Sequence, residues 1–251
     1  MKIGFISDIH EDICSLEKAL ILLKKKKIDT IYCLGDITGF SLPYYSYKET
    51  RNAGKCIDLV QKNSELSILG NHDLFTIKKI PKFTSGFIYP DDWYQTTEDN
   101  KKKLSGNKLW LYDHSDLSSE LDQNQYNYLD NLCEFEVVSQ DNQSFFLSHF
   151  IYPDLSGSTT KFPKRKSFFS KHFDFMEKNN CQLGFCGHGH YNGAGLCTKK
   201  SFSVLKPGVY TLDHTPSIII VPCIAESKSM SGITIFNTET YELEIISIND
   251  Q

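Results

Sequence analysis

Residues 3–10 read IGFISDIH, a short apolar run that passes directly into an Asp-x-His triplet. An apolar run of this length, bounded by polar residues, is typical of a buried strand. Apolar residues then recur at helical spacing over residues 16–23, and a second apolar run follows at 31–34. A helix near 56–60 and a strand at 66–69 repeat the pattern. We therefore predict an α/β protein that opens as a parallel sheet with crossover helices.

Polar residues that can bind metals follow directly after five of the apolar runs. In open α/β sheets, ligands bind at the carboxyl ends of the strands, so residues far apart in sequence can meet at one edge. Carboxylate, imidazole and amide donors suit Mn, Fe, Zn or Ni, and one carboxylate can bridge two ions. There are enough of them for two metals: Asp8, His10, Asp36, Asn71, His72, Asp73, His149, His188 and His190.

The order and spacing of these residues resemble the calcineurin-like metallophosphoesterase family, in particular its small bacterial and archaeal phosphodiesterase-like members. The resemblance spans residues 3–190 and implies a four-layer αββα sandwich of two mixed β-sheets flanked by helices. It also implies a dinuclear metal site at the C-terminal ends of the strands. The matching motifs are Asp8-x-His10, Gly35-Asp36, Gly70-Asn71-His72-Asp73, the lone His149, and Gly187-His188-x-His190.

The resemblance further implies a role for each matching residue. His72 corresponds to the family's catalytic histidine, which is not a ligand, and Asp73 beside it could orient its ring. A hydroxide that bridges the metals would attack phosphorus in line, and His72 would protonate the leaving oxygen. Asp8, His10 and His190 would hold one ion, Asn71, His149 and His188 would hold the other, and Asp36 would bridge both.

The predicted function is therefore metal-dependent hydrolysis of phosphoesters, with Mn²⁺ favoured for activity. The predicted substrate is a small phosphodiester or a nucleotide derivative, and a phosphomonoester stays open. The alternative is a protein-interaction scaffold with little or no catalysis, as some relatives of the family are. Such relatives tend to lose the catalytic histidine or a ligand, whereas this chain keeps both.

The sequence departs from the usual family pattern at three places. Phe150 follows His149 where small members usually carry glycine, and we expect its bulk to narrow or redirect the cleft. Glu11 and Asp12 replace a common Gly-Asn pair, which adds negative charge near the metal edge. Residues 207–210 read PGVY and lack the hydroxyl of a common Pro-Gly-Ser-Val turn. These changes bear on the substrate and leave the ligand set intact.

Several other groups of residues have both a functional and a structural interpretation. The run of lysines at 24–27 fits the solvated end of a helix, and Cys186 fits a core thiol better than a group near the metals. Aromatic residues that could stack on a substrate, or simply pack a loop, are Phe40, Tyr44, Tyr45, Tyr47, Trp93 and Tyr94. We interpret the basic residues Lys161, Lys164, Arg165 and Lys166 as a solvated loop, and His114, His172 and His214 as surface or packing residues.

The remaining sequence suggests one metallophosphoesterase domain over residues 1–251, with helical and loop cap elements around 74–133. Polar helical stretches near 96–110 and 117–132 belong to these cap elements. Strands at 135–138, 144–149 and 183–186 follow, with a helix near 167–177 before the last of them. The tail from residue 195 is rich in β-type runs and predicts an antiparallel completion of a second sheet.

Composition excludes several classes of function. The 251 residues carry 27 basic and 31 acidic side chains, and a net charge of −4 provides no basic surface for long nucleic acids. The longest apolar run, residues 218–225, is far too short to span a membrane. The start of the sequence lacks a signal-peptide pattern, so we predict a cytoplasmic protein with reduced cysteines. The oligomeric state stays open.

Overall fold

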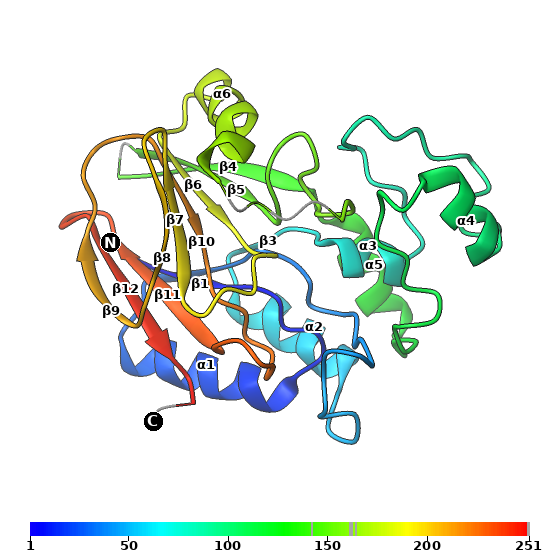
Figure 1. Cartoon of the computed structure of the whole chain (residues 1–251). Helices are drawn as coiled ribbons and strands as arrows, with labels where there is room; N and C mark the ends of the chain where they lie inside the picture. Colours follow the sequence, from blue (N-terminus) through cyan, green and yellow to red (C-terminus); the bar gives the residue numbers. More distant parts are fainter. Residues whose placement is uncertain (142, 161–162, 164, 250–251) are drawn as a thin grey trace.

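The computed structural model describes residues 1–141, 143–160, 163 and 165–249. Two mixed six-stranded sheets lie face to face, and helices cover their outer faces (Figure 1). Helices α1 (Ile13–Lys25) and α2 (Ala53–Asn63) lie against the first sheet, and α6 (Ser170–Lys178), preceded by the 3-10 turn η1 (Lys166–Phe169), lies against the second. The predicted four-layer αββα sandwich is confirmed.

The first sheet combines the N-terminal β-α-β units with strands from the end of the chain. Its order is β3-β2-β1-β11-β12-β9, in which β1, β2 and β3 run parallel as predicted. The last three strands join antiparallel, with β11 beside β1. The bounds are β1 Lys2–Ile6, β2 Thr30–Cys33, β3 Leu66–Ser67, β9 Gly208–Thr211, β11 Gly232–Asn237 and β12 Glu242–Ser247.

The second sheet has the order β4-β5-β6-β10-β7-β8, and β5, β6 and β10 run parallel at its centre. The prediction that the tail completes only a second, antiparallel sheet is wrong. Three tail strands belong to each sheet, because β10 aligns parallel to β6 while β11 pairs with β1. The bounds are β4 Phe135–Gln140, β5 Gln143–Ser148, β6 Leu183–Cys186, β7 Ala194–Thr198, β8 Phe202–Leu205 and β10 Ser217–Ile220.

The alternation of side chains in β1 shows how the layers are held together. Phe5 points between the sheets, where its ring stacks on Phe185 of β6 with centroids 3.9 Å apart. Ile6 points the other way, into the core beneath α1. Gly4 shares that face, and a Cβ there would lie 2.7 Å from Leu23 Cδ2, so glycine permits the close approach of α1. Both faces of the strand are therefore buried, as its unbroken apolar sequence predicts.

The region between the two halves contains three short helices: α3 (Asn71–Thr76), α4 (Glu98–Ser105) and α5 (Gln123–Asn131). Both predicted polar helices are shorter than expected. Gly106, with φ of 54°, ends α4 in the left-handed conformation that commonly stops a helix. The carboxylate of Asp122 accepts hydrogen bonds from the backbone of the first turn of α5 and fixes its start.

The structure also bears on the cysteines and on membrane association. Within the described ranges, no helix is long and apolar enough to cross a bilayer. All eight cysteines are free thiols, and six of them are buried. Cys186 lies in the core beside α6, where its Sγ is 3.5 Å from Ser148 Oγ, which confirms its interpretation as a core residue.

Candidate metal centre

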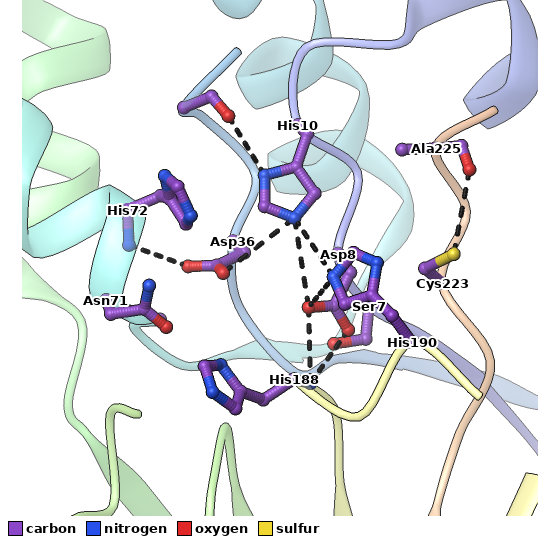
Figure 2. A network of polar contacts seen from close by, with 12 residues as sticks. Ser7, Asp8, His10, Asp36, Asn71, His72, His188, His190, Cys223 and Ala225 are labelled. Carbon is purple, nitrogen blue, oxygen red and sulfur yellow. Dashed lines mark hydrogen bonds and ion pairs between the residues drawn. The ribbon is translucent and has the colours of Figure 1, made fainter. Parts of the chain in front are cut away.

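The predicted ligands meet where the strands of the two sheets end (Figure 2). The donor atoms of Asp8, His10 and His190 lie within 4.8 Å of one another. A second group with the same spacing is formed by Asp36, His149 and His188. These are the two sets that the resemblance implies for the two ions, with Asn71 at the start of α3 beside the second.

The backbone at the site adopts conformations that most residues avoid. Five of the seven predicted ligands have positive φ, although none of them is glycine. A left-handed conformation in a residue with a side chain costs on the order of 1–3 kcal/mol, and such residues cluster at functional sites. The values are 55° for Asp8, 48° for His10, 53° for Asp36, 62° for His188 and 42° for His190.

Two of the histidines have a tautomer fixed by the backbone. His10 Nδ1 lies 3.0 Å from the carbonyl oxygen of Gly39, and His149 Nδ1 lies 2.7 Å from that of Leu34. A carbonyl oxygen only accepts, so each Nδ1 carries a proton and Nε2 is the nitrogen that each ring can present to a metal. His149 Nε2 lies 3.1 Å from Asp36 Oδ2. A lone pair and a carboxylate oxygen this close require a proton or a cation, and a divalent metal fits both groups.

Asp36 occupies the centre of the arrangement. Its Oδ1 accepts a hydrogen bond from the backbone N–H of His72 at 2.8 Å, which leaves Oδ2 facing both ligand groups. Oδ2 lies 3.1 Å from Nε2 of His149 and 3.9 Å from Nε2 of His10. A Cβ on Gly70 would lie 2.1 Å from Asp36 Oδ1, so glycine is required for this approach. One carboxylate thus faces donor atoms of both sets, as a bridging ligand must.

Asp8 is held in the same way by the backbone of the His-x-His motif. The N–H of His188 lies 2.9 and 3.2 Å from the two carboxylate oxygens of Asp8. His190 Nε2 lies 3.2 Å from Asp8 Oδ1 and 3.4 Å from His10 Nε2. The ligand atoms of Asp8, His10 and His190 therefore converge within 4.8 Å of one another, which matches the chemistry of a metal ligand set.

The amide of Asn71 has a fixed orientation. Its Nδ2 donates to the hydroxyl of Tyr112 at 2.6 Å, so Oδ1 is turned toward the other ligands. Oδ1 is buried and has no hydrogen-bond partner within the described part of the chain. A buried amide oxygen without a partner is costly, and a cation would satisfy it. A Cβ on Gly157 would lie 2.9 Å from this oxygen, so glycine leaves the space open.

The electrostatics of the site favour positive charge at its centre. Burial disfavours an ionised Asp36, yet the His149 ring holds the pKa of its carboxyl well below the usual range. Burial also disfavours a charged His149, but Asp36 and Asp8 raise its pKa to about 9. Burial lowers the pKa of His10 and of His188 to about 3, so both rings are neutral and suited to bind a metal.

The ring of His72 has a carboxylate partner, but it is not the predicted one. His72 Nδ1 lies 2.6 Å from Oδ2 of Asp116. The Asp73 carboxylate instead accepts hydrogen bonds from the backbone N–H groups of Thr38, at 2.9 Å, and Gly70, at 3.1 Å. The predicted contact between Asp73 and the His72 ring is therefore wrong, because this side chain secures the start of α3. Asp116 lies in a loop and belongs to no motif that would have marked it.

His72 itself borders the ligands. Its donor atom lies within 4.8 Å of those of His10 and Asp36, and its ring contacts that of Tyr112 with centroids 4.5 Å apart. Burial disfavours a charged ring, but Asp36 and Asp116 more than offset this and raise the pKa of His72. Because Asp116 engages Nδ1, Nε2 is the nitrogen left to act on a substrate.

Comparison with known proteins agrees with this geometry. Residues 1–192 match the family described as calcineurin-like phosphoesterase. The chain belongs to the calcineurin-like phosphoesterase family. Members of this family hydrolyse phosphoesters and typically bind two divalent metals, and this member retains an intact His/Asp candidate site.

Individual relatives of this calcineurin-like phosphoesterase are distant. An uncharacterized protein of Methanocaldococcus jannaschii is 35% identical over 77 residues, a match that spans 31% of this chain and 28% of that protein. A metallophosphoesterase from Sphaerobacter thermophilus has a similar structure, with a TM-score of 0.66 and 18% identity over 98% of this chain and 88% of its own. A hypothetical protein of Pyrococcus horikoshii OT3 has a TM-score of 0.58 and 15% identity, and the match covers 99% of this chain and 91% of its own. The structural likeness shows the shared fold.

The structure places two of the three departures from the family pattern in this phosphoesterase. Glu11 Oε2 lies 2.7 Å from Nη1 of Arg51, so its charge is paired. Asp12 caps the start of α1. Neither carboxylate lines the cleft. Phe150 does not itself line the cleft, but its ring packs 4.5 Å from that of His188, which does, so the expectation that its bulk narrows or redirects the cleft stays a prediction.

A cleft of about 630 Å³ opens over the candidate metal centre of this phosphoesterase. Three segments form its walls, through the side chains of Ser41, Pro43, Tyr44 and Tyr45, of Trp110, Leu111, Tyr112 and Ser115, and of Ser227, Lys228 and Ser229. Of the aromatic residues that could stack on a substrate or pack a loop, Tyr44 and Tyr45 line the cleft. Sequence reasoning missed the second and third walls, because they are loops without periodicity or motif. Phe40, Tyr47, Trp93 and Tyr94 pack elsewhere.

The remaining candidates lie away from the cleft or outside the described residues. Lys161 and Lys164 fall outside the described residues, and Arg165 and Lys166 do not line the cleft. His172 is buried in the core beside α6. His114 is exposed beside Glu98, and His214 packs on Tyr241.

Proposed function

We propose that this phosphoesterase is a dinuclear, metal-dependent phosphodiesterase whose substrate is a small phosphodiester or nucleotide derivative. The position of Asp36 Oδ2, which faces His149 on one side and His10 on the other, is the observation that carries the proposal. Two ions, one bound beside His149 and the other beside His10, would share the Asp36 carboxylate. Asp8, His10 and His190 would hold one ion, Asn71, His149 and His188 the other, and Asp36 both, with Mn²⁺ as the proposed metal.

The residues around the metals define the proposed chemistry. When bound, two divalent cations would lower the pKa of a water nucleophile and neutralise charge on the phosphoryl group. His72 would donate the Nε2 proton to the leaving oxygen, while Asp116 holds Nδ1 and fixes the ring. Water attack then yields a phosphomonoester and an alcohol, which takes up the donated proton.

Charge at the site favours a diester over a monoester. Two divalent ions with Asp8 and Asp36 leave a net charge of about +2 for the nucleophile and the substrate. Among the described residues that line the cleft, Lys228 is the only lysine or arginine. A dianionic monoester would gain more from an arginine clamp, whereas the charge of a monoanionic diester is matched by the site as it stands.

We further propose that residues 74–133 form a cap on one domain that spans residues 1–251.

Hydrolysis of two chromogenic esters tests the proposal. With Mn²⁺, bis(p-nitrophenyl) phosphate should be turned over faster than p-nitrophenyl phosphate, and the rate should fall without metal. His72→Ala should lower turnover about 10²- to 10⁴-fold. His114→Ala, which removes an exposed histidine 80% accessible to solvent, is the matched control and should retain the rate. A metal-loaded protein inert toward both esters would contradict the proposal and favour the scaffold alternative.

A further inference from the structure

Two large aromatic side chains lie uncovered in the walls of the cleft. Tyr44 is 65% exposed and Trp110 is 37% exposed, and both line the cleft over the metal centre. Among the residues that the structure describes, neither ring contacts another aromatic ring, and neither the hydroxyl nor the indole N–H forms a hydrogen bond. Large exposed aromatic groups beside a binding site are typical of surfaces that a ligand covers.

Two other tyrosines on the same walls, Tyr45 and Tyr112, pack on histidines of the site. Tyr45 packs on the ring of His10 with centroids 4.9 Å apart, and Tyr112 packs on that of His72. Tyr112 also accepts the hydrogen bond from Asn71. These two inner rings therefore position the catalytic centre, while Tyr44 and Trp110 stay available to a substrate.

The two aromatic walls are joined by backbone hydrogen bonds. The N–H of Leu42 donates to the carbonyl of Ser115 at 2.9 Å, and the N–H of Leu117 donates to that of Phe40 at 3.0 Å. The N–H of Trp110 donates to the carbonyl of Ser158 at 2.9 Å. The segments that carry both exposed rings are thus fixed before a ligand arrives, which reduces the entropic cost of binding.

The third wall differs in chemistry. It consists of Ser227, Lys228 and Ser229, so the apolar groups of the cleft gather on the other two walls. The volume of about 630 Å³ lies within the range of sites for small molecules and leaves room for an organic group beyond one phosphate. The cleft therefore offers exposed aromatic rings on two of its walls and polar side chains on the third.

We propose that Tyr44 and Trp110 bind a planar aromatic arm of the phosphodiester, so that the substrate class is aryl or nucleoside esters. This inference rests on the proposed function, since it takes the phosphate group to lie at the metals. Stacking on an aromatic side chain contributes enough to change affinity by about fivefold to more than a hundredfold. A saturated arm of similar size gains the apolar contact but loses the stacking.

Binding of three phosphonate monoesters tests the inference without requiring turnover. The probes are the O-methyl esters of methylphosphonate, cyclohexylphosphonate and phenylphosphonate, which share one monoanionic head group. Isothermal titration of the Mn²⁺-loaded protein should give a Kd for the phenyl compound at least about tenfold below that of the methyl compound. The Kd for the phenyl compound should also lie about threefold or more below the Kd for the cyclohexyl compound.

Variants locate the preference. Tyr44→Ala and Trp110→Ala should each reduce the ratio of phenyl to methyl affinity at least about threefold and leave the methyl compound within about twofold. The unchanged Kd for the methyl compound shows that the site is intact. Trp110→Phe should keep the preference, and so should Phe168→Ala, an exposed aromatic outside the cleft.

Two outcomes would overturn the inference. Equal affinity for the phenyl and cyclohexyl compounds would show that planarity is not recognised. A preference that survives in the Tyr44→Ala/Trp110→Ala double variant would place the aromatic group elsewhere. Failure of the proposed function is a separate result, because these affinities can be measured in a protein that hydrolyses neither nitrophenyl ester.

Discussion

Asp116 lies outside every sequence motif, yet its carboxylate is 2.6 Å from the ring of His72. We expect Asp116→Ala to lower kcat about 10- to 100-fold, the range typical of a residue that orients another group. KM should change little, because Asp116 does not line the cleft. Asp116→Asn keeps an acceptor oxygen but loses the charge, so its kcat should lie between that of the wild type and that of Asp116→Ala. Steady-state kinetics on bis(p-nitrophenyl) phosphate measure both constants.

The metal content of these Asp116 variants separates positioning from a structural role. Two ions per chain should remain in both, because Asp116 contacts none of the predicted ligands directly in the described hydrogen bonds. A variant that loses its metals, or one with an unchanged kcat, would contradict the assigned role.

His172 offers a prediction about pH and stability. It is fully buried, its Nδ1 accepts from the backbone N–H of Tyr152 at 2.9 Å, and burial lowers its pKa to about 3. The pKa in the unfolded chain is about 6.5, so the unfolded state takes up the proton first and stability falls as pH drops below 6.5. Between pH 7.5 and 5 the free energy of unfolding should fall by about 2 kcal/mol from this residue alone.

Urea unfolding of the wild type and of His172→Gln at both pH values isolates this contribution. Glutamine keeps an acceptor for Tyr152 but does not titrate, so the variant should lose about 2 kcal/mol less than the wild type over the same interval. Parallel losses in the two proteins would show that His172 does not titrate as described.

Single residues differ in how far the sequence could reveal them. The convergence of the candidate ligands could be predicted because each follows an apolar run, and sheet geometry brings strand ends together whatever their distance in sequence. The partner of His72 could not, because Asp116 is 44 positions away in a loop and only tertiary packing brings it there. Asp73 was the expected partner by adjacency, but residues next to each other at the start of a helix point in different directions.

At the scale of elements, helix α4 is attached to the cleft wall by a buried ion pair. The Lys101 side chain is 2% exposed, and its ammonium lies 2.6 Å from Oδ1 of Asp113, whose side chain is 28% exposed. Trp93 and Tyr94 place their rings 5.7 and 5.8 Å from the same ammonium. The pair joins α4 to the segment that also carries Trp110 and Asp116.

Removing Asp113 should lower the free energy of unfolding more than removing the charge of Lys101. Asp113→Ala leaves a buried ammonium without its carboxylate and should destabilise the protein by about 3 kcal/mol. Lys101→Met leaves a carboxylate that water can reach and should cost about 1 kcal/mol or less. Urea unfolding measures both changes. Equal losses, or a larger loss for Lys101→Met, would show that desolvation of the ammonium does not dominate.

The elements themselves were predictable where local signals are strong. The β-α-β opening follows from apolar periodicity, and both sides of β1 are buried as its sequence indicates. The ends of α4 and α5 depend on single capping residues, Gly106 and Asp122, which a periodicity argument does not weigh. Alternation identified the tail strands but not their sheets, because the choice of partner for β10 and β11 depends on contacts between distant strands.

At the scale of the whole molecule, the two sheets each supply part of one charged centre. Asp8 and Asp36 follow strands of the first sheet, and His149, His188 and His190 follow strands of the second. Two bound cations would therefore connect the sheets at the edge where the cleft opens.

Metal stoichiometry in two variants tests the central claim, that Asp36 is shared by two ions and His72 binds neither. Protein purified with Mn²⁺ should carry about two ions per chain by elemental analysis, and Asp36→Asn should lose occupancy at both sites because it removes the shared charge. His72→Ala should keep both ions and lose turnover. If His72→Ala lost its metals as readily as Asp36→Asn, or if Asp36→Asn kept both, the division of roles between these residues would be contradicted.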